Sequence, residues 1–396
     1  MRFFDIRRPD NAILGAVTHK IDNLNKPKGS LGMLEHLARQ ICLVQQTLTP
    51  HLNRPCHLLF AADHGIEREG VSIAPRDVTW QQMINFTRGG GGVNMFCRQH
   101  GFSLRLIDVG VDHDLSAFPD IVNRKIARGT RNFLHGPAMT AAQLDRAVDI
   151  GAAEVDACAA EGCDIVCVGE MGIANTSASA LWMCVIGSVP LDECVGVGSG
   201  LDDDGLRHKK EILARALARY NESQTNSLTE SPIRFAPAKN SPLSNRISDS
   251  LAGASNRISD SLCASKELST LNSQLSTLNC MSYFGGFEMV AAVGAFLRAA
   301  ERHIIILVDG FIMTACMLAA AALCPEVVSY AVFGHCGDEH GHRRLLRLMN
   351  ARPLLSLGMR LGEGTGALCA FPVVDSAVRM VNEMNSFDNA DITKYF

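Results

Sequence analysis

Short apolar runs alternate with amphipathic stretches along most of the chain. Apolar runs suited to buried strands occupy residues 57–62, 103–109, 163–168, 303–308 and 327–332. Between them apolar residues recur at helical spacing, as in residues 140–160 and 287–300. Strands that are apolar throughout are typical of a parallel sheet covered on both faces. The pattern therefore predicts an α/β fold with a mostly parallel sheet flanked by helices.

Polar groups directly follow several of the predicted strands. Asp63 and His64 come after the first strand, Asp309 after the fourth and His335 after the fifth. In open α/β sheets, ligands bind in the crevice outside the carboxyl ends of the strands. We therefore expect a functional site at this edge of the sheet.

Two segments lie outside the alternation. Residues 1–50 are predicted to be helical, with a turn at 26–30 from which Ser30 could cap a second helix. Residues 221–280 are rich in Ser, Asn, Leu and Thr, and contain two copies each of SNRISDSL and LSTLN. Two copies are too few for a solenoid. This composition predicts a low-complexity insertion that is flexible or poorly ordered, with a recruited binding loop as the alternative.

Composition excludes several classes of function. The 396 residues are 47% hydrophobic, which is ample for a large core, and the net charge of -4 provides no electrostatic footprint for nucleic acid. The 14 cysteines form no CxxC pair, and the first twenty residues have no apolar signal region. We expect a cytoplasmic protein. The apolar window 303–323 is interrupted by Asp309, so no membrane span is predicted.

One carboxylate, Glu363, lies between two glycines and just before the apolar residues 367–374. Glycine allows unusual dihedral angles and close backbone approach. An acid held against an apolar wall can have its pKa raised toward that of a working base. A solvent-exposed glutamate in an ordinary turn is the alternative, and the spacing alone does not decide between them.

Two further glycine-rich stretches favour a phosphate site. Residues 169–177 join a predicted strand to a helix, where backbone amides can bind phosphate. Residues 196–200 precede a helix bearing Lys209, which could supply a point charge. An ordinary capped turn is the alternative for the first stretch. Because Glu170 is unsuited to neighbour a phosphate, we expect it to face a ribose or the reacting centre.

Residues 335–342 concentrate His, Cys, Asp and Glu, which are the usual metal ligands. Adjacent side chains in such a run point in different directions, so a metal site would need further ligands, for which Asp63 and His64 are candidates. A metal-dependent phosphohydrolase that uses Asp63, His64, His335 and Asp338 is therefore an alternative function.

In combination these motifs resemble the nicotinate-nucleotide:dimethylbenzimidazole phosphoribosyltransferase family. The matching segments follow the order expected of that family and cover nearly all of the chain outside 221–280. They are KPKGSLGMLE (26–35), AADHGI (61–66), VTWQQMINFTRGG (78–90), DVGVD (108–112), GEMGIANTSASA (169–180), VGVGSGLDDDGLRHK (195–209), GGFEMVAAVGAFL (285–297), LVDGFIMTA (307–315) and LGMRLGEGTGALCAFP (357–372).

The resemblance implies an architecture and a reaction. A Rossmann-like catalytic domain at 51–364, carrying the insertion 221–280, would be joined to a small helical domain from 1–50 and about 365–396. Phosphoribose would move from nicotinate mononucleotide to 5,6-dimethylbenzimidazole, giving nicotinate and α-ribazole 5'-phosphate for assembly of the cobalamin nucleotide loop. The resemblance further implies a homodimer that requires no cofactor and no metal.

The resemblance also implies roles for individual residues. Glu363 would be the general base, and Glu170 a second acid beside the reacting ribose. Phosphate and ribose would contact Gly172, Asn175, Thr176, Ser177, Gly198, Ser199, Gly200 and Lys209. The benzimidazole would contact Gln82, Ala74 and Leu361.

This chain departs from the expected family pattern in two ways. About sixty residues stand where the family has a short connection before GGFE. Gly337 and Ala74 stand where family members often carry Ser. A non-catalytic nucleotide or benzimidazole binder, inactivated by the insertion, is therefore a second alternative.

Overall fold

The computed structural model describes residues 2–229, 258–390 and 392–394. Its strands form one sheet in the order β3-β2-β1-β4-β5-β6, and every neighbouring pair is parallel. The strands are β1 (Cys56–Ala62), β2 (Ser103–Gly110), β3 (Ile121–Asn123), β4 (Ile165–Met171), β5 (Ile305–Val308) and β6 (Ala331–Phe333). The predicted fold class is confirmed.

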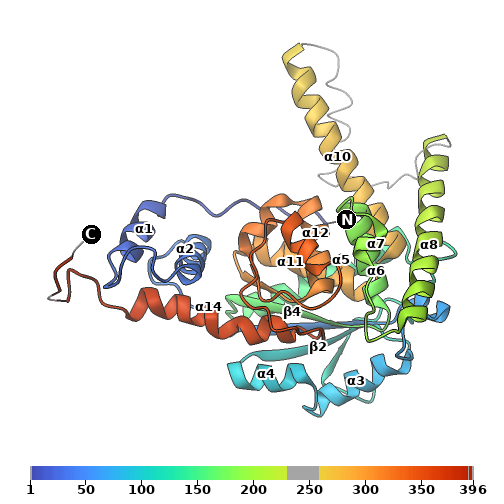
Figure 1. Ribbon diagram of the computed structural model, residues 1–396, viewed down its shortest axis with the longest axis horizontal. Coiled ribbons are helices and arrows are strands. Elements are labelled where there is room, and N and C mark those ends of the chain that lie inside the picture. The colour runs from blue at the N-terminus through green and yellow to red at the C-terminus, as the bar shows by residue number, and fades with distance from the viewer. Residues whose placement is uncertain (1, 230–257, 391, 395–396) are drawn as a thin grey trace.

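Helices cover both faces of this sheet (Figure 1). On one face lie α3 (Asp77–Thr87), α4 (Gly92–His100) and the first part of α14 (Thr365–Glu383); on the other lie α5 (Ala141–Ala160), α11 (Phe287–Glu301) and α12 (Phe311–Leu323). Every residue of β1 is buried. This two-sided burial explains why the strands are apolar throughout, without the alternation of a half-exposed strand.

The direction of winding reverses at β1. The chain moves outward from β1 through β2 and β3, and then returns to place β4 on the other side of β1. At such a reversal the connections leave in opposite directions and open a crevice at the carboxyl ends of the two central strands. The topology therefore places a candidate site beyond the ends of β1 and β4.

The two ends of the chain meet away from the sheet. Helices α1 (Leu14–Asp22) and α2 (Met33–Gln45) lie beside the far half of α14, at the end of the molecule opposite α8 (Figure 1). A buried ion pair between Lys26 and Glu35, at 2.7 Å, fixes the turn between α1 and α2. This arrangement is what a small helical unit drawn from both termini would require.

The N-terminal prediction is wrong in two details. Residues 2–11 are not helical but run along the α/β body, where the amide of Asp5 donates to Glu301 and the carbonyl of Arg7 accepts from Tyr330. Ser30 does not cap the second helix, because α2 begins at Met33 after Gly32. These two tertiary hydrogen bonds and the burial of Phe4 and Ile6 hold the first segment in an extended course.

Other boundaries also differ from the sequence prediction. Residues 325–330 form a 3-10 turn, η2, so the last strand is shorter than predicted and begins at Ala331. The helix expected from Ser179 begins earlier, at Asn175. Strand β3 was not predicted, because only three residues pair with β2. Short pairings of this kind leave little periodicity to detect.

The prediction that residues 221–280 form a flexible insertion is partly wrong. Helix α8 (Asp203–Thr229) continues into it, and α10 (Ile258–Phe284) ends it and packs on α6 (Asn175–Ile186) and α12. The two LSTLN copies lie seven residues apart, which places Leu271, Leu275 and Leu278 at helical spacing, and Leu278 is buried. The first SNRISDSL copy lies outside the described residues.

The remaining elements are η1 (Gly65–Glu69), α7 (Leu191–Cys194) and α13 (His342–Leu348). No helix among the described residues is long and apolar enough to cross a membrane.

Two glycines allow a close contact between helices α5 and α11 in the core. A Cβ on Gly151 of α5 would lie 1.8 Å from the carbonyl oxygen of Ala291, and a Cβ on Gly294 of α11 would lie 2.2 Å from that of Val148. The backbones of α5 and α11 therefore touch directly, which only glycine permits at these positions.

We predict that Gly151→Ala lowers the free energy of unfolding by roughly 1–3 kcal/mol or more, because backbone atoms cannot give way as side chains do. Urea denaturation followed by circular dichroism would measure it. Gly15→Ala is the matched control: Gly15 lies in α1 with no atom within 4 Å of the new Cβ, and alanine should stabilise by about 0.5–1 kcal/mol there. Equal effects of the two substitutions would contradict the proposed close contact.

Candidate functional site

A cavity of about 320 Å³ opens at the carboxyl ends of β4 and β5, beside the reversal in strand order. The N-terminus of α6, the loop around Gly198 and residues 359–363 complete its walls. Its polar lining consists of Ser72, Glu170, Asn175, Thr176, Ser199, Asp309, His335, Glu339, Arg360 and Glu363. The structure thus brings together the glutamate turn and both glycine-rich loops that the sequence singled out.

Glu363 is buried in a turn of unusual backbone geometry. It is 6% exposed, and Gly362, Glu363 and Gly364 have φ angles of 81°, 61° and 82°. Its Oε2 accepts a hydrogen bond of 3.2 Å from the amide of Val93, in the first turn of α4. Burial raises the pKa of Glu363, and the Val93 amide opposes that rise. The alternative of a solvent-exposed glutamate is therefore wrong.

Glu170 lies near the end of β4 and is also buried. Its carboxylate accepts a hydrogen bond from the Asn175 side chain. Burial raises the pKa of Glu170 to about 8, and the negative charge of Glu288 adds to the rise, whereas Asn175 opposes it. In this environment Glu170 retains its proton near neutral pH.

Asp309 and His335 form a buried pair beside His342, and sequence reasoning assigned these three residues no shared role. Asp309 accepts from the Ala367 amide at 2.9 Å and pairs with Nε2 of His335 at 3.3 Å. Burial acts to raise the pKa of Asp309, but His335 and the amides outweigh it and lower the pKa. His342 accepts from the Gly337 amide at 2.9 Å. The position of Asp309 directly after an apolar strand was the available signal.

The phosphate loops are tied together by Lys209. Its Nζ donates to Oγ1 of Thr176 at 3.0 Å and to the carbonyl of Gly196 at 3.1 Å. Burial lowers the pKa of Lys209 to about 8, and the charge of Glu339 opposes this. Lys209 does not line the cavity but reaches it through Thr176.

The other predicted phosphate and ribose residues divide into two groups. Lining the cavity are Gly172, Asn175, Thr176, Gly198 and Ser199. Ser177 and Gly200 are not among the lining residues, and the Ser177 hydroxyl is buried without a hydrogen-bond partner in the described part of the chain. The cavity thus meets the N-terminus of α6, a favourable position for an anion.

Of the predicted base-binding residues, only Leu361 lines the cavity; its side chain is 61% exposed. Ala74 precedes α3, and Gln82 lies within it, where its Oε1 accepts from Asn85 at 3.0 Å. Gly337 lines the cavity, and a Cβ there would lie 3.0 Å from the carbonyl oxygen of Met359. A serine at 337 would therefore require its neighbours to shift.

The residues of the hypothetical metal site take other partners. His64 contacts Glu288 at 2.6 Å, His335 contacts Asp309, and Oδ2 of Asp63 accepts from the Asp112 amide at 2.7 Å. Among the described residues, no three His, Cys, Asp or Glu side chains are grouped as metal ligands. The set of Asp63, His64, His335 and Asp338 is therefore not assembled here.

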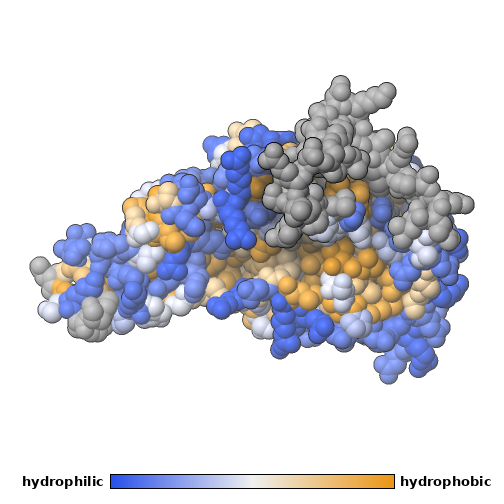
Figure 2. All heavy atoms as spheres, turned by 90° about the horizontal axis from the view of Figure 1, so that it is seen from above, coloured by the Kyte–Doolittle hydropathy of each residue, from blue (hydrophilic) through white to orange (hydrophobic). Residues whose placement is uncertain are grey.

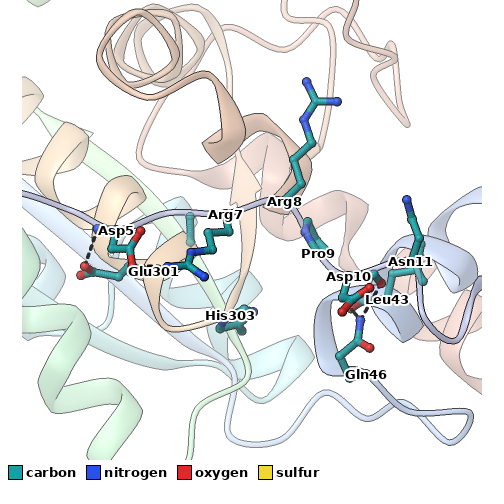
Figure 3. A pocket seen from close by; sticks show the side chains of 11 residues that line it. Asp5, Arg7, Arg8, Pro9, Asp10, Asn11, Leu43, Gln46, Glu301 and His303 are labelled. Atoms are coloured by element: carbon teal, nitrogen blue, oxygen red, sulfur yellow. Dashed lines mark hydrogen bonds and ion pairs between the residues drawn. The ribbon is translucent and has the colours of Figure 1, made fainter.

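A second and larger hollow, of about 700 Å³, lies beside the N-terminal segment (Figure 3). Asp5, residues 7–11, the end of α2, the last residues of α11 and His303 surround it. It shares no lining residue with the cavity at the strand ends. The conspicuous motifs of the sequence are absent from its lining, so the smaller cavity is the better candidate site.

Comparison with known proteins agrees with this geometry. A family model described as "Phosphoribosyltransferase" matches residues 6–233 and 256–392. A Bacteroides fragilis protein named nicotinate-nucleotide–dimethylbenzimidazole phosphoribosyltransferase is 50% identical over 396 residues, covering 100% of both chains. Proteins of the same name from Phocaeicola vulgatus and Dechloromonas aromatica are 48% and 44% identical, with at least 99% of each chain covered.

A solved structure also resembles this chain over nearly its whole length. The crystal structure of CobT from Thermus thermophilus has a TM-score of 0.80 and 32% identity, covering 97% of this chain and 99% of that one.

The family match is interrupted only between 233 and 256, which leaves 256 − 233 − 1 = 22 unmatched residues. The expectation that about sixty residues interrupt the family pattern is therefore wrong.

Proposed function

The chain belongs to the nicotinate-nucleotide–dimethylbenzimidazole phosphoribosyltransferase family, and from this premise we propose how its cavity performs that reaction. Phosphoribose moves from nicotinate mononucleotide to 5,6-dimethylbenzimidazole, giving nicotinate and α-ribazole 5'-phosphate. The observation that carries the proposal is the position of Glu363, buried on the wall of the cavity that the phosphate loops also line.

Glu363 serves as the general base. The free nitrogen of the benzimidazole attacks C1' of the ribose, and the bond from C1' to the nicotinate nitrogen breaks with its electron pair leaving on nicotinate. The other benzimidazole nitrogen then carries a proton that must be removed, and Glu363 takes it. A carboxylate whose pKa is raised by burial is a stronger base than a solvent-exposed one.

The phosphate binds at the N-terminus of α6. Backbone amides at this helix start are suited to an anion, Thr176 lines the cavity beside them, and Ser199 lines the facing loop. Lys209 supports this site through its hydrogen bonds to Thr176 and Gly196. It acts from behind the loop, as a buried charge and as a tie between the two stretches.

Glu170 faces the reacting centre. The nicotinate ring of the substrate is a cation while it is bonded to C1', and positive charge spreads to the ribose as the bond breaks. An ionised carboxylate stabilises both. Because the pKa of Glu170 is about 8, the approaching cation favours loss of its proton, so binding and ionisation are coupled.

The alternatives have less support. A phosphohydrolase would require the metal ligands that are not assembled among the described residues. A binder inactivated by an insertion is disfavoured because relatives named as the enzyme align with the whole chain. The predicted contacts of the benzimidazole with Gln82 and Ala74, and the division into catalytic and small helical domains, remain part of this proposal.

A homodimer is also part of the proposal. A broad apolar area covers one face of the α/β body (Figure 2), and apolar areas of this kind often mark interfaces. Near the cavity, Ile73 and Leu361 are 65% and 61% exposed.

A cytoplasmic location is a further part of the proposal. The free thiols of the described cysteines suit a reducing compartment, which supports it.

Glu363→Gln should lower kcat by roughly 10²-fold or more, the usual scale for loss of a general base. Nicotinate release from nicotinate mononucleotide, with 5,6-dimethylbenzimidazole present, measures it. Glu383→Gln, at the exposed end of α14, is the matched control and should retain the full rate. If folded Glu363→Gln releases nicotinate at the parent rate, Glu363 is not the general base. If the folded parent protein releases no nicotinate, the proposed reaction is wrong.

The pH dependence should report Glu170. Its pKa is raised, so the active ionised form is scarce below about 8, and kcat/KM should increase as the pH rises through that value. Glu170→Gln should remove this limb and lower the plateau. If the parent and Glu170→Gln show the same rise of kcat/KM with pH on both sides of this pKa, the ionisation belongs to another group.

Lys209→Met should raise the KM for nicotinate mononucleotide by roughly 10-fold or more, because a charged hydrogen-bond donor behind the phosphate loop is lost. Lys210→Met is the matched control: it removes a neighbouring lysine that pairs only at the surface with Asp192, at 3.4 Å. Steady-state kinetics with both variants would show the difference. Equal KM values would remove Lys209 from the phosphate site.

A further inference from the structure

His57 is a buried histidine that the mechanism above does not use. It lies in β1, between Cys56 and Leu58, and its side chain is fully buried. Neither ring nitrogen has a well-formed hydrogen bond to any described residue. Burial lowers the pKa of His57 to about 4, so the ring is neutral at physiological pH. For stability alone an apolar side chain would suit this position better, because an unpartnered polar group in a core is costly.

The ring lies directly beneath the glutamate turn. A Cβ on Gly364 would be 2.1 Å from Cε1 of His57 and 2.9 Å from its Nε2, so the ring occupies the space under that Cα. A Cβ on Gly169 would be 2.5 Å from the carbonyl oxygen of Glu363 and 2.7 Å from Nε2 of His57. The ring therefore also approaches the Glu363 carbonyl, in a contact that falls short of a full hydrogen bond.

A second residue of the sheet reaches the same turn. Cys167 of β4 is the register partner of His57, and its Sγ lies 3.8 Å from the carbonyl oxygen of Gly364. Both contacts are made to backbone atoms, and Gly364 and Gly169 have no side chains that could yield. The two central strands thus form a rigid floor on which the turn rests.

The turn requires such a floor. Three consecutive residues have positive φ, and Glu363 is the one among them that incurs a steric penalty for it. Above the floor, the Val93 amide holds the carboxylate. A turn of this kind persists only where its surroundings define its conformation.

We propose that His57 is a positioning residue for Glu363, with its flat neutral ring setting the height and tilt of the turn that carries the carboxylate. This proposal depends on the proposed role of Glu363 as the base. Leucine has a similar volume but is not planar and carries no N–H, so it would displace the turn while keeping the core filled.

The experiment compares His57→Leu, Glu363→Gln and the double variant in the nicotinate-release assay, with the thermal midpoint of each. We expect His57→Leu to lower kcat by roughly 10-fold to 100-fold, the scale of a misplaced catalytic group, with an unchanged or higher thermal midpoint. In the Glu363→Gln background the same substitution should cause no further loss, because His57 acts through that carboxylate.

Leu58→Met is the matched control, since it changes a fully buried neighbour in the same strand on the opposite face of the sheet; it should keep kcat within about twofold. A kcat of His57→Leu within twofold of the parent would overturn the proposal, as would an equal further loss in the double variant. An undiminished kcat in Glu363→Gln alone would instead reject the proposed role of Glu363 as general base. If His57→Leu does not fold, His57→Gln carries the same comparison.

Discussion

The conformation of residues 362–364 is the constraint on which the site depends. A glutamate with positive φ, flanked by glycines with positive φ, is unfavourable in isolation. It is held by α4 through the Val93 amide, by β1 and β4 from below, and by α14, which starts at Thr365. Because α14 also packs on α2, the helices at the chain ends and the parallel sheet are joined through this turn.

Charge divides the cavity into two regions that match the two ends of the substrate. The buried carboxyl groups of Glu170, Asp309 and Glu363 gather at the strand ends, and burial together with the neighbouring acids raises the pKa of Glu170 and Glu363. The N-terminus of α6, backed by Lys209, provides the opposite environment. A molecule with a cationic ring at C1' and a phosphate at C5' fits this division.

Most of the fold could be predicted because each central strand is buried on both faces. The apolar runs at 57–62 and 163–168 correspond to β1 and β4. Of the polar residues at predicted strand ends, Glu170, Asp309 and His335 line the cavity, whereas Asp63 and His64 do not. The predictions failed where tertiary contacts, and not the periodicity of apolar residues, decided the local structure. Residues 327–332 looked like a strand but mostly form η2, and 221–280 looked unstructured although α10 packs against α6 and α12.

The residues of the candidate site were only partly predictable. Glu363, Glu170 and Thr176 stand in short motifs whose glycines and donors signal ligand contact, so sequence alone was enough to nominate them. Lys209 was nominated for direct phosphate contact, yet it lies behind Thr176. Asp309 was visible at a strand end, but its partner His335 follows much later in the chain, and nothing in the local pattern pairs them.

The sequence by itself determined the parallel sheet, the edge at which the cavity opens and the identity of the motifs, because these follow from local periodicity and residue type. Tertiary structure alone decided which groups face each other. Whether Glu363 is solvated or buried depends on α4 and β1, which are distant in the chain. The pKa of Glu170 depends on its burial and on the charge of Glu288, a residue of α11. Burial and charge proximity are properties of the folded arrangement, and no spacing within one motif contains them.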